Sequence, residues 1–132
     1  MNGSELLIDS NIIINLLNHR LPSLHEEWII ERINQGVAIS VITWIEVLGW
    51  TGHTKEGLHI AESLLRLCDR IELTPTIRDQ TIALRQQHRI KLPDALIAAT
   101  AQAQSLALLT LNEKDFEHIP EIMLATWPAA EG

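Results

Sequence analysis

The chain has 132 residues and a formal net charge of −7, with 46% hydrophobic and 20% charged residues. This length and composition predict a single packed domain over residues 1–132 and exclude an intrinsically disordered protein. The only cysteine, Cys68, excludes a disulfide framework and a cysteine-based zinc site. The N-terminus lacks the basic and apolar regions of a signal peptide, so we expect a cytoplasmic protein.

Short apolar runs alternate with helical patterns along the chain. In order, the predicted elements are a strand over residues 6–8, helices over 11–18 and 24–35, a strand over 37–42, helices over 43–50 and 55–67, a strand over 71–73, helices over 76–88 and 94–105, a strand over 106–110 and a short final strand over 123–126. Apolar strands separated by helices are typical of a parallel sheet buried on both faces. We therefore predict an α/β fold of three layers, with a central, mostly parallel sheet of four to five strands and helices on both faces.

The stretch from 95 to 112 carries no charge and is long enough to be mistaken for a membrane span. It holds six polar side chains among its 18 residues, however, which is too many for a segment in lipid. A buried helix followed by a buried strand explains this stretch better, and we expect no contact with a membrane.

Acidic and amide side chains stand where predicted strands end and helices begin. Asp9 ends the first strand, Glu46 is expected in the first turn of the helix after the second strand, and Asp94 begins a later helix. Asn112 and Asp115 follow the strand that ends at residue 110. Because ligands bind at the carboxyl ends of parallel strands, we expect these five side chains at one edge of the sheet.

Carboxylates held close together repel one another and raise each other's pKa. A hard cation such as Mg²⁺ or Mn²⁺ relieves this repulsion, and it favours oxygen ligands, often with a phosphate among them. The candidate metal ligands are Asp9, Glu46 and Asp94. This set of residues indicates metal-dependent chemistry on phosphate esters.

Each of these acidic residues also has a purely structural interpretation. Asp9 could cap the helix that follows it, and Asp94 suits the positive end of a helix dipole. Thr43 and Glu46 have the spacing of a capping box, in which the glutamate bonds back to the amide of the threonine. Capping alone, however, does not predict that all three acids converge on one edge of the sheet.

Four segments in a fixed order resemble the motifs of one family. They are Leu-Ile-Asp9-Ser-Asn11, Ile-Thr43-Trp-Ile-Glu46-Val, Leu-Pro-Asp94-Ala-Leu-Ile-Ala-Ala-Thr100-Ala and Leu-Thr110-Leu-Asn112-Glu-Lys-Asp115-Phe116. From about residue 6 to residue 128, the chain resembles a PIN domain of the VapC-like branch of bacterial toxin nucleases. The resemblance implies a Mg²⁺- or Mn²⁺-dependent endoribonuclease that pairs with an antitoxin protein and commonly forms a homodimer.

The resemblance also assigns roles to residues. It places Asp9, Glu46 and Asp94 at the three acidic positions of the family, as metal ligands and catalytic groups. The fourth acidic position falls on Asn112, whose amide is a weaker cation ligand than a carboxylate. Asp115 is close by in sequence, and we expect it to assist through a water molecule.

Four further residues are expected to contact the RNA substrate. Arg85 and Arg89 lie four residues apart on a predicted helix that runs toward Asp94, so they can meet backbone phosphates. A solvated helix face is the alternative interpretation of these arginines. Asn11 and Thr110, which belong to the quoted motifs, complete the set.

Other functions stay open at this point. A receiver-like phospho-acceptor domain has a similar length and an acidic Mg²⁺ pocket, but no adjacent acidic pair follows the first strand of this chain. A PIN nuclease could also serve in RNA processing outside a toxin–antitoxin pair. A third possibility is a PIN-fold protein that acts chiefly by binding.

Overall fold

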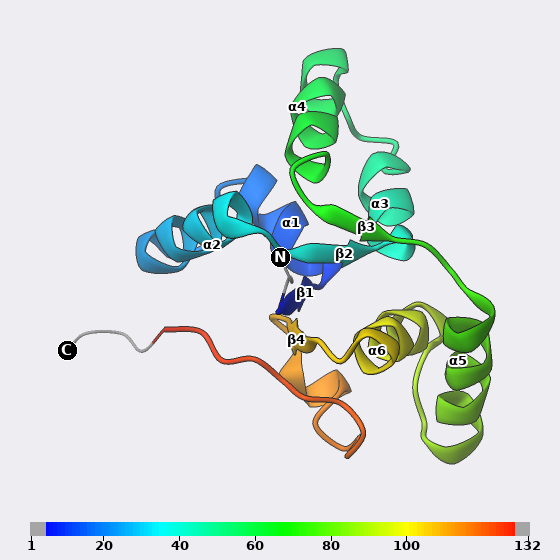
Figure 1. Ribbon diagram of the computed structural model, residues 1–132. Helices are drawn as coiled ribbons and strands as arrows, with labels where there is room; N and C mark the ends of the chain where they lie inside the picture. Colours follow the sequence, from blue (N-terminus) through cyan, green and yellow to red (C-terminus); the bar gives the residue numbers. More distant parts are fainter. Residues whose placement is uncertain (1–4, 129–132) are drawn as a thin grey trace.

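A computed structural model describes residues 5–128 (Figure 1). In chain order it contains β1 (Leu6–Ile8), α1 (Ser10–Leu17), α2 (Ser23–Gln35), β2 (Ala38–Ser40), α3 (Val41–Leu48), α4 (Lys55–Leu65), β3 (Asp69–Ile71), α5 (Pro75–Gln87), α6 (Leu92–Gln104), β4 (Ala107–Leu109) and the 3₁₀ helix η1 (Glu113–Asp115). Within this range, no helix combines the length and the apolar character that crossing a membrane requires.

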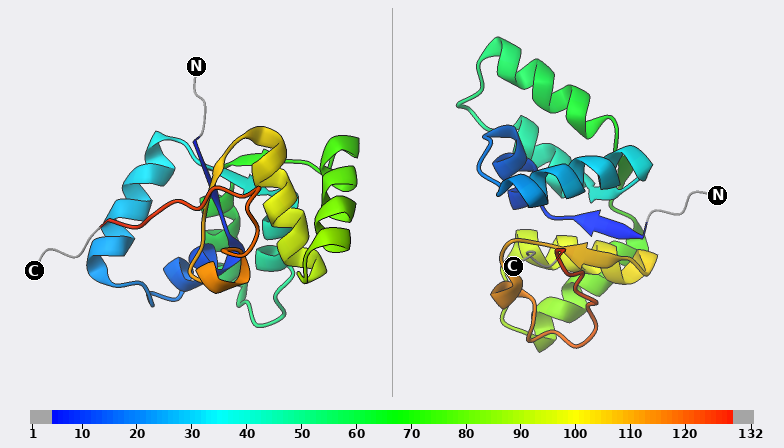
Figure 2. Two further views of the ribbon diagram at one scale, coloured as in Figure 1. Left: turned by 90° about the horizontal axis from the view of Figure 1, so that it is seen from below. Right: turned by 90° about the vertical axis from the view of Figure 1, so that its left-hand side faces the viewer.

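The four strands are parallel and lie in the order β3-β2-β1-β4. Leu7 of the central strand β1 is in register with Ala38 of β2 and with Leu108 of β4. Helices α1 to α4 cover one face of the sheet, and α5 and α6 cover the other (Figures 1 and 2). The predicted three-layer α/β fold with a parallel sheet is therefore confirmed.

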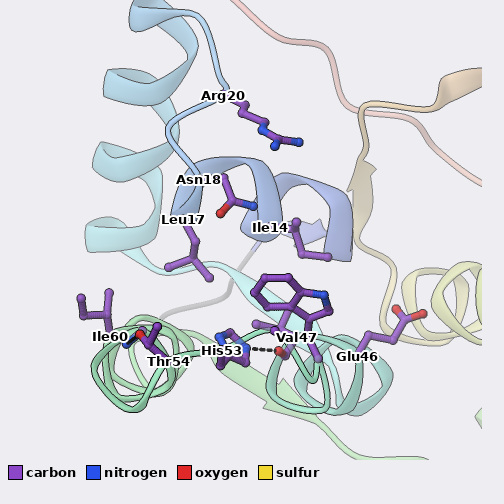
Figure 3. Close-up of a pocket in the computed structure, with 12 residues that line it drawn as sticks. Ile14, Leu17, Asn18, Arg20, Glu46, Val47, His53, Thr54 and Ile60 are labelled. Atoms are coloured by element: carbon purple, nitrogen blue, oxygen red, sulfur yellow. Dashed lines mark hydrogen bonds between the residues drawn. The ribbon is translucent and has the colours of Figure 1, made fainter.

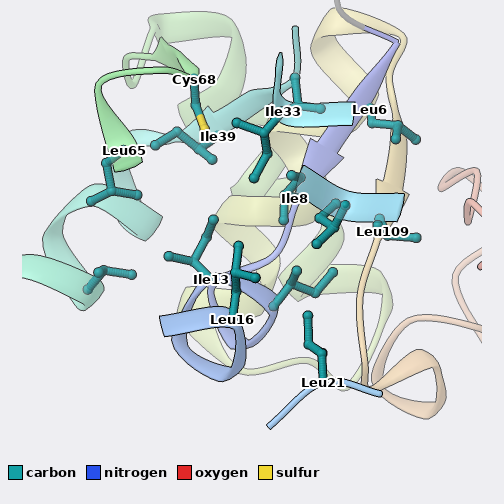
Figure 4. Close-up of a cluster of buried hydrophobic side chains, with 14 of the residues drawn as sticks. Leu6, Ile8, Ile13, Leu16, Leu21, Ile33, Ile39, Leu65, Cys68 and Leu109 are labelled. Atoms are coloured by element: carbon teal, nitrogen blue, oxygen red, sulfur yellow. The ribbon is translucent and has the colours of Figure 1, made fainter. Parts of the chain in front are cut away.

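The alternation of side chains along β1 divides the hydrophobic core into two parts. Leu6 and Ile8 pack with apolar side chains of α1 to α4 (Figure 4), whereas Leu7 between them packs with α5 and α6. Burying a side chain of this size contributes roughly 1.5–3 kcal/mol. Because β1 is held from both faces, the residue that follows it, Asp9, has a fixed position.

The boundary between β2 and α3 differs from the prediction. Helix α3 begins at Val41, because the Ser40 hydroxyl accepts a 3.1 Å hydrogen bond from the amide of Ile42 and caps the helix there. The predicted strand over 37–42 was too long, since apolar residues at 41 and 42 fit a strand and a buried helix equally well. Thr43 lies inside the helix, so the capping box with Glu46 is wrong.

Two other strand predictions also need correction. The third strand is Asp69–Ile71 and not 71–73. The predicted last strand over 123–126 contributes one isolated bridge, in which Leu124 pairs with Leu108 of β4. Within residues 5–128 the sheet therefore has four strands, and the bridge lies at its β4 edge.

The direction of the chain across the sheet reverses between β1 and β4. From β1 the chain proceeds to β2 and β3 on one side, and it then returns to β4 on the other side. In open parallel sheets, ligands bind at such a reversal, at the carboxyl ends of the strands. Asp9 follows β1 and Thr110 follows β4, so both residues lie at this point.

Candidate active site

Asp9 is a buried carboxylate whose two oxygens are both oriented by hydrogen bonds. It is 5% exposed and caps α1, where its Oδ1 accepts a 2.8 Å hydrogen bond from the amide of Ser10. Its Oδ2 accepts a 2.7 Å hydrogen bond from the hydroxyl of Thr110. The capping interpretation of Asp9 is thus correct, and the same residue lies at the expected edge of the sheet.

Thr110 lies behind Asp9 rather than on the surface. It is 2% exposed, and its hydroxyl oxygen also accepts a 3.0 Å hydrogen bond from the amide of Asn112. The Asn11 side chain lies beside it, with Nδ2 at 3.5 Å from the threonine hydroxyl and Oδ1 at 3.4 Å from the amide of Leu111. In this arrangement Thr110 orients Asp9, and Asn11 ties the loop after β4 to α1.

Glu46 reaches the same region from α3. It lies in the second turn of that helix, not in the first turn as predicted, and its Oε1 accepts a 2.6 Å hydrogen bond from the hydroxyl of Ser10. The Ser10 hydroxyl also lies 3.0 Å from the hydroxyl of Thr43. Sequence reasoning missed Ser10, for which the only signal was a hydroxyl side chain directly after Asp9.

Asp94 lies in the first turn of α6, where the helix dipole favours a negative charge. Partial burial raises the pKa of its carboxyl. The charges of Asp9, Asp115 and Glu46 raise this pKa further, in that order. The ammonium group of Lys91 opposes them and lowers it. The carboxylate of Asp94 makes no hydrogen bond or ion pair with any other residue in the range 5–128.

The pKa of Asp9 is raised by the same kinds of interaction. Burial raises this pKa, and the hydrogen bonds from Thr110 and Ser10 counteract the effect only in part. The charges of Glu46 and Asp115 raise the pKa of Asp9 as well. Because each of the two central aspartates responds to the same neighbouring charges, the predicted acidic residues share one region of the molecule.

Asp115 and Asn112 lie on the exposed side of this region. Asp115 belongs to η1, which follows Asn112 directly, and the side chains of both residues are exposed. Asp115 also lines a cavity of about 380 Å³ together with Asp94 and the predicted substrate residues Arg85 and Arg89. The structure thus brings the two arginines to the border of the acidic region.

The carboxylates of the acidic region do not all converge on one metal-binding position. Among residues 5–128, no three Asp, Glu, His or Cys side chains lie close enough together to enclose a metal ion. Mg²⁺ commonly binds through only one or two carboxylates, and it keeps several waters or takes substrate phosphates. Asp9 and Asp94 fit such a site, because both are oxygen donors whose ionisation the surroundings disfavour and a cation would favour.

A model of the PIN domain matches residues 6–122. The chain belongs to the PIN domain family. Ribonuclease VapC10 of Mycobacterium tuberculosis is 32% identical over 118 residues, which cover 81% of this chain and 82% of that protein. This PIN domain is also similar to a solved chain of a toxin–antitoxin complex from Klebsiella pneumoniae. That chain is 33% identical, with a TM-score of 0.75 over 93% of this chain and 99% of the other.

A second solved relative belongs to VapBC-1 from nontypeable Haemophilus influenzae. It is 26% identical, with a TM-score of 0.74 over 92% of this chain and 97% of the other. The VapC-like resemblance seen in the four sequence motifs is therefore confirmed by relatives that match most of the chain. The similarity in fold extends over the parallel sheet and its helical layers.

Proposed function

We propose that the protein is a divalent-metal-dependent endoribonuclease that hydrolyses RNA phosphodiester bonds. The observation that carries the proposal is the pair Asp9 and Asp94, two aspartates from separate elements whose pKa values are raised by burial and by shared neighbouring charges. Such a pair is costly without a cation and well suited to hold one. The similarity to a protein named Ribonuclease VapC10 supports RNA as the substrate.

Each acidic residue has a separate task in this proposal. Asp9 and Asp94 would hold Mg²⁺ or Mn²⁺ directly, whereas Glu46 would accept a proton from a water molecule. The metal supplies Lewis-acid chemistry, which lowers the pKa of a water and neutralises charge at the phosphate. Asn112 and Asp115 complete the polar surroundings on the exposed side.

The proposal is tested with purified protein and end-labelled RNA. We expect cleavage with Mg²⁺ or Mn²⁺ and none with EDTA. A DNA strand of the same sequence shows whether the protein prefers RNA. A protein that cuts RNA equally well in EDTA would contradict the metal-dependent mechanism. A protein that binds RNA but never cuts it would support the PIN-fold protein that acts by binding.

We further propose an antitoxin protein as the partner. The solved relative from Klebsiella pneumoniae is described as part of a toxin–antitoxin complex. In this chain a cavity of about 600 Å³ between α1, α3 and α4 extends to Glu46 (Figure 3), and exposed apolar side chains line it. An antitoxin segment would place apolar side chains in this cavity and an arginine against the carboxylates, which an arginine binds in a bidentate manner.

Expression in a bacterial host tests the partner. Expression of the chain alone is expected to arrest growth, and co-expression of the protein encoded next to it is expected to restore growth. If the chain never slows growth although the purified protein cuts RNA, a PIN nuclease of RNA processing is the better conclusion.

A further inference from the structure

The basic residues of this acidic protein are unevenly distributed. Of its ten lysines and arginines, four line the cavity of about 380 Å³ beside Asp94 and Asp115. These four residues are Arg85, Arg89, Lys91 and Lys114. The same cavity is lined by His118, so a net charge of −7 coexists with a local concentration of cations.

None of these four cations is neutralised by an ion pair within residues 5–128. Three other arginines do form such pairs, each with an exposed acidic neighbour: Arg66 with Glu62, Arg70 with Glu72 and Arg78 with Asp79. Two carboxylates, Asp94 and Asp115, also line the cavity, so its four cations exceed its acidic groups and repel one another. An anion that enters the cavity removes this repulsion and gains charge-assisted hydrogen bonds.

Two segments of the chain build the cavity, residues 85–94 and residues 114–118. Arg85 lies in the last turn of α5, but the helix ends at Gln87, so Arg89 lies in the following loop and not on the helix as predicted. Lys91 is the residue directly before α6, and Lys114 belongs to η1.

The loop between α5 and α6 is anchored on both sides. The imidazole of His88 lies 3.2 Å from the Glu121 carboxylate, and its ring packs edge-on against the ring of His118 at 6.0 Å between centroids. Ile90, in the same loop, packs against the core beneath α5 and α6. The cations therefore project from a supported backbone, which lowers the entropic cost of holding them around a ligand.

We propose that this cavity binds a backbone phosphate of the RNA strand that flanks the cleaved bond. The inference rests on the proposed function and adds the path of the substrate to it. Asp94 and Asp115 belong to both the cavity and the acidic region, so a phosphate in the cavity has the catalytic carboxylates as its immediate neighbours. The strand thus runs from Asp9 over the start of α6 toward the end of α5.

The test measures RNA binding by fluorescence anisotropy in EDTA, where no metal-dependent cleavage takes place. The probe is a fluorescein-labelled single-stranded RNA of about 12 nucleotides, a length within the usual site sizes for single strands. Two double variants, Arg85→Ala/Arg89→Ala and Lys91→Ala/Lys114→Ala, each remove two of its cations. The matched control, Arg66→Ala/Arg78→Ala, removes the same charge from other exposed sites. All six side chains are exposed, and circular dichroism confirms that each variant is folded.

Each cavity variant is expected to bind RNA about tenfold more weakly, while the control changes affinity by less than about twofold. The slope of log K against log salt should fall by about 0.7 for each phosphate of the single strand that a variant no longer neutralises. Equal losses of affinity in cavity and control variants would overturn the proposal, because they would reflect net charge alone. Competition by inorganic phosphate as effective as that of RNA would overturn the assignment to a nucleic-acid strand.

The outcomes separate this inference from the proposed function. If wild type binds RNA through the cavity in EDTA but cuts nothing with Mn²⁺, the nuclease proposal fails and the cavity stands. If wild type cuts RNA while both cavity variants keep the wild-type affinity and salt slope, the cavity fails and the nuclease proposal stands. Unchanged RNA binding together with weaker binding of the co-expressed partner would assign the cavity to an acidic protein segment instead.

Discussion

The hydroxyl of Ser10 donates a 2.6 Å hydrogen bond to the carboxylate of Glu46, and this contact joins α1 to α3. Ser10 is 7% exposed, whereas Glu46 is exposed, so a fixed residue holds a side chain that is otherwise free to rotate. The amide of the same serine orients Asp9. One residue thus positions two of the proposed catalytic carboxylates.

Replacing Ser10 by alanine should therefore impair catalysis without unfolding the protein. Loss of a group that orients a catalytic or metal-binding carboxylate typically costs about 10–100-fold in activity or metal affinity. We expect kcat for RNA cleavage to fall within that range with KM nearly unchanged, and calorimetry to show weaker Mn²⁺ binding. Ser63→Ala, the same change at an exposed site on α4, is the control. Wild-type kcat and Mn²⁺ affinity in Ser10→Ala would remove Ser10 from the site.

Asp94→Asn should abolish cleavage while the fold stays intact. The exchange keeps the size of the side chain but removes the charge that is proposed to hold the cation. Loss of several kcal/mol of transition-state stabilisation corresponds to about 100-fold or more in rate. The measurement is kcat/KM with Mn²⁺ alongside circular dichroism, with Asp79→Asn on the exposed surface of α5 as the control. Undiminished cleavage by pure Asp94→Asn would refute the active-site assignment.

The stability of the metal-free protein should fall as the pH rises. The pKa values of Asp9 and Asp94 are raised in the folded state above the ordinary value of 3.8, so the folded state binds more protons than the unfolded state above pH 3.8. The stabilisation is complete below pH 3.8 and is lost as the pH rises through the raised pKa values. Asp94→Asn should consequently melt higher than wild type at about pH 7 in EDTA, and this gap should close near about pH 4.

Added Mg²⁺ should stabilise wild type and so reverse its lower melting temperature relative to Asp94→Asn. A ligand present at about 100 times its Kd stabilises the folded state by about 2.7 kcal/mol, and Asp94→Asn should gain much less because it has lost a ligand. Thermal melts of both proteins with EDTA and with Mg²⁺ provide the comparison. A wild-type curve that neither Mg²⁺ nor Mn²⁺ moves would argue against a shared metal site.

Asn112→Asp should strengthen Mn²⁺ binding and destabilise the metal-free fold. It adds a carboxylate beside the acidic region, where a carboxylate is a better cation ligand than an amide. Asp115→Asn should weaken Mn²⁺ binding and stabilise the metal-free fold. The larger of the two changes in Mn²⁺ affinity identifies the fourth position of the site. Calorimetric titration measures both, with Asn34→Asp on the exposed surface of α2 as the control. A gain in Asn34→Asp equal to that in Asn112→Asp would indicate a general charge effect.

The sequence was most informative where an apolar run ends abruptly at a polar residue. Asp9 was correctly predicted at the end of its strand and Asp94 at the start of its helix, because the strand end at Ile8 and the helix start at Pro93 are both local signals. The start of α3 was misplaced, since the apolar residues after Ser40 fit both a strand and a buried helix. This error concealed the true position of Glu46 within its helix.

Contacts between distant elements could not be predicted from local pattern. The bond between Ser10 and Glu46 depends on how α1 packs against α3, which is set by the whole core. In the same way, Lys114 lines the same cavity as Arg85 only because η1 lies beside the segment that joins α5 and α6. The spacing along the chain places Lys91 near the two arginines but gives no indication of Lys114, and only the arginines were predicted as substrate residues.

The central position of β1 has a consequence for synthesis of the chain. Its partner β4 and the hydroxyl that orients Asp9 come from residues about 100 positions later, at Leu108 and Thr110. At translation rates of about 5–20 residues per second, roughly 5–20 s separate the appearance of the two halves of this contact. A nascent chain therefore carries only part of its carboxylate site until residues 107–110 have been synthesised and β4 can pair with β1.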